Sequence, residues 1–401
     1  MKSRVHALLF AGDRQFVTMR GLSMLTAMAF ALIYSKQLGV ERRGLLTFVM
    51  VTNLVFSILL ISGISLHLRN IARKEEGREV LGTYISIVLL FSFLTPILNL
   101  LVLDIYQEIT DNNIPNNLVY VCVLYCFFST MSYGMHDALL LIKSIKIASV
   151  MDLGVVVLQI IGYLTLVYSG ETSYFVSVLI SISISYLVMI SSTLLLIMYI
   201  YNPKIGISWG SLRKLFVDSS TPTLVNMSSQ LIERIDKVFI GLQTTTSELG
   251  RFSTSQSLLG LSRFVFDALT KLAIARDRNF LVWKKSYFSL LLATIFFGLS
   301  FTVIANQFIT RFLGPEWGLP IVMLLALGYL ELIRGVHSLV VVNSLRRNKY
   351  SRLRHVTFAQ LIIGLGVQPI AIHFIGLWGS IICSSIILIS GILYLRDDSR
   401  E

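Results

Sequence analysis

The stretch SSQLIERIDKVFIG, residues 228–241, places four ionisable side chains in one short segment. These are Glu233, Arg234, Asp236 and Lys237. By itself the stretch has the pattern of an amphipathic helix of a soluble protein, with its charges in water. The sequence on both sides of it is strongly apolar, however, so the charges require a different explanation.

The composition of the whole chain is that of a membrane protein. Of 401 residues, 55% are hydrophobic and only 14% are charged, whereas about a quarter of the residues in soluble domains are charged. Several apolar runs reach 18 or more residues, the length that predicts a membrane-spanning helix. We therefore expect an all-α polytopic membrane protein. The three cysteines lie inside apolar runs and are interpreted as packing residues.

The apolar runs predict about twelve transmembrane helices, each long enough to cross a hydrocarbon core of about 30 Å. Their expected bounds are 15–36, 44–67, 81–103, 117–141, 148–168, 174–200, 219–241, 252–275, 286–309, 319–343, 355–373 and 376–395. We expect two six-helix bundles around a central cavity, one over 1–200 and one over 219–401. The linker over 201–218 places Trp209, Leu215 and Phe216 at helical spacing, which predicts a short helix on the cytoplasmic interface.

The distribution of positive charge predicts the orientation. Most of the 34 Lys and Arg residues lie in the termini and in the loops on one side of the predicted membrane. The loops on the other side contain Lys36, Arg42, Arg43, Arg251 and Arg311. The positive-inside rule then places both termini in the cytoplasm. The net charge of +12 reflects this topology and contact with anionic membrane lipid. The sequence shows no soluble basic domain that could bind nucleic acid. We therefore do not expect nucleic acid to be a partner.

A faint internal repeat relates the two halves. KQLGVERRGLLTF, residues 36–48, joins the first two predicted spans, and TTTSELGRFSTSQ, residues 244–256, joins the seventh and eighth. Aligning Gly44 with Gly250 sets the two turns at corresponding places in each half. Because six spans precede the second half, both halves enter the membrane in the same direction, and the repeat is expected to be parallel.

The charges in span 219–241 are expensive if they face lipid. Its apolar side chains contribute about −4 kcal/mol toward insertion, while each charged residue near the centre costs about +2.5 to +3.5 kcal/mol. The charges must therefore face protein or a watery cavity. At 100° per residue, Glu233 and Lys237 share one face and Arg234 lies beside them. Asp236 lies on the other side and is expected to anchor packing near the outer end.

Other predicted spans carry polar faces as well. Arg20 lies in the first span, Glu331 and Arg334 are one turn apart in the tenth, and Gln256, Arg263, Asp267 and Lys271 share a face of the eighth. Together these faces predict a hydrated interior with more basic than acidic groups, which suits an anionic substrate such as a diphosphate.

A purely structural interpretation of these charges remains open. The pairs Arg263–Asp267 and Glu331–Arg334 would then only orient helices, Lys237 would extend to the interface, and His337 would be a hydrogen-bonded packing residue. Three further residues lie near predicted cytoplasmic ends and are expected to be interfacial, namely His136, Asp137 and Asp152.

The sequence gives no sign of catalysis. All loops are short, and the chain contains no metal-ligand cluster, P-loop or G-x-S-x-G motif. Membrane glycosyltransferases, polymerases and ligases usually need soluble domains or large external loops. We therefore expect a transporter or a structural membrane protein, with neither an enzymatic activity nor a cofactor or metal.

Three segments resemble a known family. YSKQLGVERRGLLTFV (34–49), SGISLHLRNIARKE (62–75) and TPTLVNMSSQLIERIDKVFIG with SELGRFSTSQSL (221–241 and 247–258) are similar to the corresponding segments of bacterial polysaccharide flippases. These are the O-antigen and exopolysaccharide flippases of the multidrug/oligosaccharidyl-lipid/polysaccharide (MOP) exporter superfamily. The resemblance covers most of the chain in topology but is strong only around 34–76 and 215–260.

The resemblance implies a function and a location. Such proteins move undecaprenyl-diphosphate-linked oligosaccharides, including lipopolysaccharide O-antigen units, to the outer leaflet of the bacterial inner membrane by alternating access. The lipid-linked oligosaccharide would be the main partner, with a polysaccharide polymerase and glycosyltransferases as further candidates. The substrate-binding candidates are Arg20, Arg234, Lys237, Arg263, Lys271 and Arg334, and the candidates for ion coupling are Glu233, Asp267 and Glu331.

Three alternatives stay open at this point. The first is a multidrug/cation antiporter of the same superfamily, which would favour acidic residues over the basic excess seen here. The second is an unrelated two-bundle secondary transporter. The third is a non-transporting membrane scaffold or an integral membrane enzyme.

Overall fold

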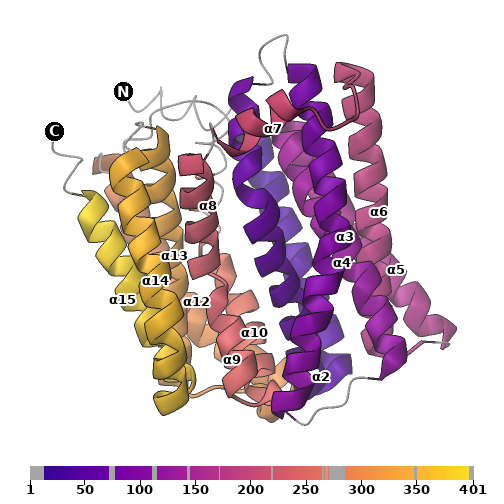
Figure 1. The fold of residues 1–401 in the computed structure, drawn as a ribbon. Coiled ribbons are helices and arrows are strands. Elements are labelled where there is room, and N and C mark those ends of the chain that lie inside the picture. The colour runs from indigo at the N-terminus through magenta and orange to yellow at the C-terminus, as the bar shows by residue number, and fades with distance from the viewer. Residues whose placement is uncertain are drawn as a thin grey trace.

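The computed structural model describes residues 13–71, 77–110, 115–141, 145–170, 172–217, 220–263, 266, 270, 285–346 and 350–396. These residues are almost entirely helical and include no strand, which confirms the all-α class. Within the described residues, eight helices are long and apolar enough to cross a membrane. The chain is thus a multi-pass membrane protein. In Figure 1 the helices up to α6 lie on one side and those from α8 onward on the other.

The first helix of the structure, α2 (Asp13–Ile71), contains both of the first two predicted spans. The turn expected between them lies at Gly39, whose non-helical φ of 74° and ψ of 170° separate α2 into two helical arms. Glycine takes this positive φ without the steric cost that a side chain would add. The rest of this half consists of α3 (Gly77–Thr110), α4 (Asn116–Leu141), α5 (Ile145–Ser169) and α6 (Tyr174–Tyr201).

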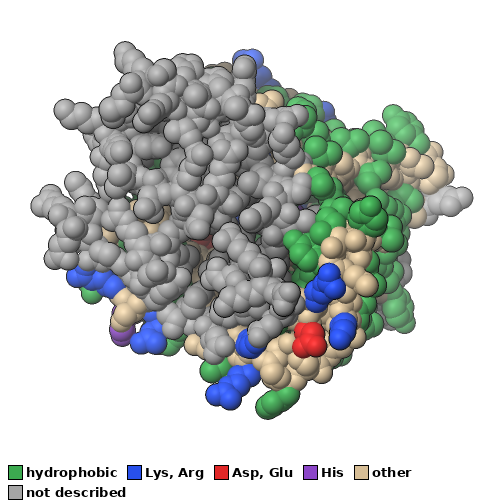
Figure 2. Space-filling model, turned by 90° about the horizontal axis from the view of Figure 1, so that it is seen from above, with side chains coloured by type: hydrophobic (Ala, Val, Ile, Leu, Met, Phe, Trp, Pro, Cys, Tyr) green, Lys and Arg blue, Asp and Glu red, His purple; other side chains and the backbone are tan. Residues whose placement is uncertain are grey.

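The short helix expected in the linker is α7 (Trp209–Phe216). Its first turn is capped by Ser208, whose hydroxyl accepts a hydrogen bond from the Ser211 backbone N–H at 3.2 Å. Leu215 is fully buried, whereas Trp209 is 84% exposed and available to a membrane interface. Figure 2 views the molecule from the end where α7 lies, and the described ionisable side chains visible there are mostly Lys and Arg. This is the side that the charge distribution predicts to be cytoplasmic.

The second half continues with a less regular set of helices. It contains α8 (Ser220–Ile232), α9 (Ile235–Gln243), α10 (Thr246–Leu259), η1 (Gly260–Arg263), α12 (Lys285–Phe312), η2 (Pro315–Trp317), α13 (Ile321–Arg346), α14 (Tyr350–Ile375) and α15 (Leu377–Arg396). The predicted spans from 286 onward agree with α12 to α15 within a few residues. The predicted span 219–241 is divided between α8 and α9.

Large apolar side chains cover much of the outside of both halves. Phe93, Leu195 and Phe374 are each more than half exposed. In a soluble protein such surface would favour aggregation, but lipid tails are as apolar as these side chains, so their exposure is stable in a bilayer. Packing of the helices must therefore depend on close fit and on polar contacts in the interior.

The two segments that the repeat relates, around Gly44 in α2 and around Gly250 in α10, contact each other. A Cβ built on Gly44 would lie 1.8 Å from the carbonyl oxygen of Thr246, and one built on Gly250 would lie 2.1 Å from that of Val40. One turn further along, the hydroxyls of Thr47 and Ser253 are hydrogen-bonded at 2.9 Å. The same offset of 206 residues separates Thr47 from Ser253 and Gly44 from Gly250. Contacts between equivalent residues are what a local two-fold axis produces, and they support the parallel repeat expected from the sequence.

Replacing Gly44 with valine is expected to destabilise the packing of α2 against α10. The added side chain would collide with backbone atoms, which cannot rotate away, so the helices must separate at a cost of about 3 kcal/mol. The thermal unfolding midpoint of the purified protein in detergent would measure this loss. Gly154→Ala in α5 is the matched control, because a Cβ there meets nothing within 4 Å. Equal unfolding midpoints for the two variants would contradict the close contact.

Candidate functional site

The stretch that carries the four charges is not a continuous helix. Helix α8 ends at Ile232 and α9 begins at Ile235, with Arg234 at φ −122° and ψ −27° between them. The expectation of one unbroken span over 219–241 is therefore wrong. A break at membrane depth leaves backbone groups without helical partners, and such backbone is tolerated only where it is buried in protein or lines a watery cavity.

The neighbouring segment is irregular too. Helix α10 ends at Leu259 and is followed by the 3₁₀ turn η1, which carries Arg263 on its last residue. The predicted span 252–275 thus starts earlier, at Thr246, and loses its α-helical geometry before Arg263. The two irregular segments, around Arg234 and around Arg263, contribute to the wall of one cavity.

This cavity, here called the cationic cavity, has a volume of about 360 Å³. It is lined by Arg20, Met24, Ala27, Met28, Ala31, Glu233, Arg234, Lys237, Gln256, Ser257, Gly260, Leu261, Arg263, Glu331 and Arg334. Five of these residues are basic and two are acidic. Residues of α2 complete a wall otherwise built by the break between α8 and α9 and by α9, α10, η1 and α13, so the cavity lies between the two halves.

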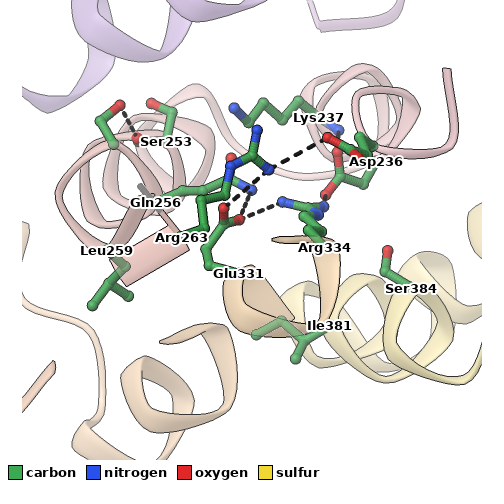
Figure 3. Close-up of polar contacts among 12 residues, drawn as sticks. Asp236, Lys237, Ser253, Gln256, Leu259, Arg263, Glu331, Arg334, Ile381 and Ser384 are labelled. Atoms are coloured by element: carbon green, nitrogen blue, oxygen red, sulfur yellow. Dashed lines mark hydrogen bonds and ion pairs between the residues drawn. The ribbon is translucent and has the colours of Figure 1, made fainter. Parts of the chain in front are cut away.

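At the base of the cavity, Arg334 binds two carboxylates. Its two Nη atoms lie 2.5 Å from Asp236 Oδ2 and 2.6 Å from Glu331 Oε1, and its side chain is only 1% exposed. Glu331 Oε1 also accepts a hydrogen bond from the Gln256 amide at 2.7 Å. Figure 3 shows these side chains converging from α9, α10 and α13. A buried arginine that lost these partners would be strongly destabilising, so this contact fixes the three segments together.

The second arginine of the network is Arg263, on η1. Its Nη1 lies 3.3 Å from Glu233 Oε2 and 3.5 Å from Glu331 Oε2. Glu331 therefore joins Arg263 to Arg334 (Figure 3). The result is a chain of alternating charges, from Asp236 through Arg334, Glu331 and Arg263 to Glu233. All three carboxylates of this chain are already compensated by an arginine.

Two cations on the cavity wall are not compensated in this way. Neither Arg234 nor Lys237 forms an ion pair with any residue that the structure describes. Lys237 is only 9% exposed. A cation that is held away from bulk water, and whose neighbouring carboxylates are already bound by other cations, favours the binding of an anion. The cavity therefore presents two cations to a ligand.

A second cavity, here called the hydroxyl-rich cavity, lies in the N-terminal half and has a volume of about 460 Å³. It is lined by Arg20, Ser23, Met24, Ala27, Leu54, Ser57, Ser129, Ser132, Tyr133, His136, Asp152, Val155, Val156, Gln159, Tyr186 and Met189. Arg20, Met24 and Ala27 line both cavities. The first arm of α2 therefore borders both cavities.

The charges of the hydroxyl-rich cavity form one cluster. Asp152 Oδ2 lies 2.5 Å from Arg20 Nη1, and its other oxygen lies 3.3 Å from Nδ1 of His136. His136 and Asp152, which were expected to be interfacial, both line this cavity. Sequence position placed them near helix ends, and only the packing of α4 and α5 against α2 brings them to Arg20.

The structure thus gathers seven of the predicted site residues around the cationic cavity, namely Arg20, Glu233, Arg234, Lys237, Arg263, Glu331 and Arg334. Two others, Asp267 and Lys271, lie outside the described residues, as does the side chain of Asp137. His337 is fully buried, and its Nε2 lies 3.4 Å from the Gln360 amide oxygen. Asp236, which the helical period assigned to packing, does not line the cavity and instead holds Arg334.

Removal of the central arginine is expected to destabilise the protein. Arg334→Met leaves Asp236 and Glu331 buried without their shared partner, a change that typically costs about 3–5 kcal/mol. Adding Asp236→Asn to that variant is expected to recover part of the loss, since one uncompensated charge disappears. Denaturant or thermal unfolding of the purified protein measures both effects. Arg311→Met, at an exposed position on α12, is the control, and an equal effect there would contradict the role of the network.

Comparison with known proteins identifies the fold. No family model matches the sequence, and no curated protein matches it either. Among solved structures, an inward-facing multidrug resistance MATE family transporter of the MOP superfamily matches with a TM-score of 0.63 at 14% identity, over 97% of this chain and 98% of that one. The MATE transporter VcmN of Vibrio cholerae, in a bent form, matches with a TM-score of 0.60 at 13% identity, over 97% of both chains.

A third structure is informative for its chemistry. A MOP superfamily transporter from Pyrococcus furiosus, described as having a binding pocket of reverse polarity, matches with a TM-score of 0.56 at 14% identity. The match covers 97% of this chain and 95% of that one. Taken together, these matches over nearly the whole chain show that this protein has the fold of the MATE transporters of the MOP superfamily.

Proposed function

We propose that this protein is a transporter that moves prenyl-diphosphate-linked oligosaccharides across a bacterial inner membrane, from the cytoplasmic to the outer leaflet. The observation that carries the proposal is the pair Arg234 and Lys237, which face the cationic cavity without an ion pair to any described residue. A diphosphate supplies two adjacent anionic groups for two adjacent cations. Export of a cell-surface polysaccharide, such as an O-antigen, would follow from this activity.

The local geometry favours a phosphate ligand. Arginine offers a planar fork of donors that matches phosphate oxygens, and lysine adds a point charge. The break at Arg234 also places the first turn of α9 at the cavity, and the positive end of a helix attracts anions. In this proposal the diphosphate binds at the break, while the prenyl chain remains in lipid.

The fold supports movement of the substrate by alternating access. Proteins with this fold have been solved in inward-facing and in outward-facing conformations. A cavity between two halves is the geometry in which rocking of the halves exposes one site to each side in turn. For ion coupling at Glu233 or Glu331, the coupling ion would have to displace an arginine contact. Asp267, the third candidate for ion coupling, lies outside the described residues.

A multidrug or cation antiporter is the second candidate, and the multidrug transporter among the matching structures favours it. A cationic substrate requires a carboxylate whose charge is not already compensated. The carboxylates that line the two cavities all contact arginine. Glu233 and Glu331 contact Arg263, and Asp152 contacts Arg20. The electrostatics of the described residues therefore favour an anionic substrate over a cationic one.

Loss of both uncompensated cations is expected to abolish export. In a strain that lacks the native gene, Arg234→Gln combined with Lys237→Gln should restore less than a tenth of the wild-type surface polysaccharide. This estimate follows because each lost hydrogen bond to a charged group weakens binding by about 1.5–3 kcal/mol. Arg213→Gln, at an exposed position on α7, is the control. Full export by the double variant, at equal protein level in the membrane, would rule out this cavity as the substrate site.

Deletion of the gene distinguishes the two candidate functions. The proposed function predicts that lipid-linked repeat units accumulate on the cytoplasmic leaflet and that surface polysaccharide is lost. A labelled lectin or periodate, applied to intact cells and to inverted vesicles, reports the leaflet on which the sugars reside. An unchanged surface polysaccharide together with increased sensitivity to cationic drugs would support the antiporter instead.

A further inference from the structure

The hydroxyl-rich cavity has a chemistry unlike that of the cationic cavity. Six of its lining residues carry hydroxyl groups, namely Ser23, Ser57, Ser129, Ser132, Tyr133 and Tyr186, and Gln159 adds an amide. These groups come from four helices, α2, α4, α5 and α6. Each hydroxyl is both a donor and an acceptor, so the cavity wall can satisfy donors and acceptors of either kind.

The charges of this cavity cancel. Asp152 compensates Arg20 and also contacts His136, so this cavity lacks the excess of cations that characterises the cationic cavity. Among the described lining residues, this cavity has no cation that is free of a carboxylate partner and could bind a phosphate group. The lining instead suits an uncharged ligand that hydrogen-bonds at many points.

The polar groups are also enclosed. Ser132 is 4% exposed and Gln159 is 8% exposed. Polar side chains at such positions lose their water and need partners. Among the residues that the structure describes, the hydroxyl of Ser132 bonds only a weak acceptor, the sulfur of Met189 at 3.4 Å. The polar groups therefore favour a ligand that supplies further hydrogen bonds.

Apolar surfaces alternate with these polar groups. Val155, Val156 and Met189 line the same cavity, as do the rings of Tyr133 and Tyr186. Sugars combine the same two features, since their ring faces carry C–H groups and their edges carry hydroxyls. Ser57 and Tyr133 already donate hydrogen bonds within the protein, but an apolar ligand would offer none to Ser132 or Gln159, and a small polar ligand would leave the apolar side chains uncovered.

We propose that the hydroxyl-rich cavity binds the first sugar residues of the substrate, those next to the diphosphate. The inference rests on the function proposed above and assigns the two cavities separate parts of one molecule. Arg20 lines both cavities, so the two cavities adjoin at this residue, and in this proposal a ligand with its diphosphate at Arg234 extends past Arg20 to place its sugars in the second cavity. Its volume of about 460 Å³ lies in the range of sites for drug-sized molecules, about 300–1,000 Å³, and accommodates a few sugar residues.

One hydrogen bond connects the hydroxyl-rich cavity to the C-terminal half of the molecule. The hydroxyl of Tyr133, in α4, donates a hydrogen bond at 2.8 Å to the side-chain oxygen of Gln230, in α8. Gln230 in turn donates to the Asn226 side chain at 3.2 Å. A sugar bound beside Tyr133 would therefore adjoin the contact between the halves.

The test compares the binding of two kinds of probe by the purified full-length protein. The first is farnesyl diphosphate, and the second is farnesyl diphosphate that carries glucose, galactose or N-acetylglucosamine. Dissociation constants come from intrinsic fluorescence or from ligand-dependent thermal stabilisation. For the wild type, at least one glycosylated probe is expected to bind about tenfold more tightly than the sugar-free probe, the effect of one or two added hydrogen bonds.

The variants separate the two cavities. Gln159→Leu and Ser132→Ala are each expected to reduce the advantage of the glycosylated probe to less than threefold, with unchanged affinity for farnesyl diphosphate. That unchanged affinity also shows that the variants fold. Arg234→Gln is expected to raise the dissociation constants of both kinds of probe by the same factor. Ser192→Ala, at an exposed position on α6 whose hydroxyl bonds the Val188 carbonyl, is the matched control and should resemble the wild type.

Other results overturn the inference in distinguishable ways. Equal affinity of the wild type for all probes removes the sugar site and leaves the diphosphate site standing. If Gln159→Leu and Ser132→Ala reduce the affinity for both kinds of probe by the same factor, the hydroxyl-rich cavity only supports the structure. Failure of the wild type to bind any of these probes removes the proposed function together with the inference.

Discussion

The chain of ion pairs from Asp236 through Arg334 and Glu331 to Arg263 connects segments that lie far apart in the sequence. Ionised groups are costly inside a membrane protein unless each has a partner at hydrogen-bond distance. Here the partners come from α9, α13 and η1, so the charges are tolerated only when these segments pack together. Because lipid provides little hydrophobic drive for association between helices, such contacts carry much of the specificity of packing.

The network also explains why two cations face the cavity. Its three carboxylates are engaged by Arg263 and Arg334, and none of them pairs with Arg234 or Lys237. The break between α8 and α9 lies at Arg234, next to the Glu233 end of this chain of charges. In the first turn of α9, the backbone N–H of Lys237 donates to Asp236 Oδ1 at 2.8 Å and to the Arg234 carbonyl oxygen at 3.2 Å.

The two cavities give the halves of the molecule different chemistry on a shared architecture. The halves meet through equivalent residues at Gly44 with Gly250 and at Thr47 with Ser253, as in a symmetric dimer. The N-terminal half contributes hydroxyl groups and a compensated charge cluster to the hydroxyl-rich cavity. The C-terminal half contributes an excess of cations to the cationic cavity. Arg20 belongs to both sites. A substrate with an anionic group and a polar, uncharged group would fit such a pair of cavities.

The sequence alone determined the class of the protein, the positions of most helices and the excess of basic residues in the interior. These properties follow from local quantities, namely the length of apolar runs, the 100° helical period and the distribution of Lys and Arg. Glu233 and Lys237, which the helical period placed on one face, both line the cationic cavity, although the helix is broken between them. The helical period could not reveal that Asp236 binds Arg334, or that Arg20 binds Asp152, because those partners are brought together only by packing of distant helices.

The tertiary structure alone decided which charges are compensated. Gln256 and Glu331 meet across 75 residues, and Asp152 meets Arg20 across 132 residues. It also decided that the stretch at 228–241 breaks at Arg234, although its apolar pattern is continuous. The physical reason is that the free energy of a charge in a membrane depends on its nearest partners, and these are set by how the helices pack rather than by the order of residues along the chain.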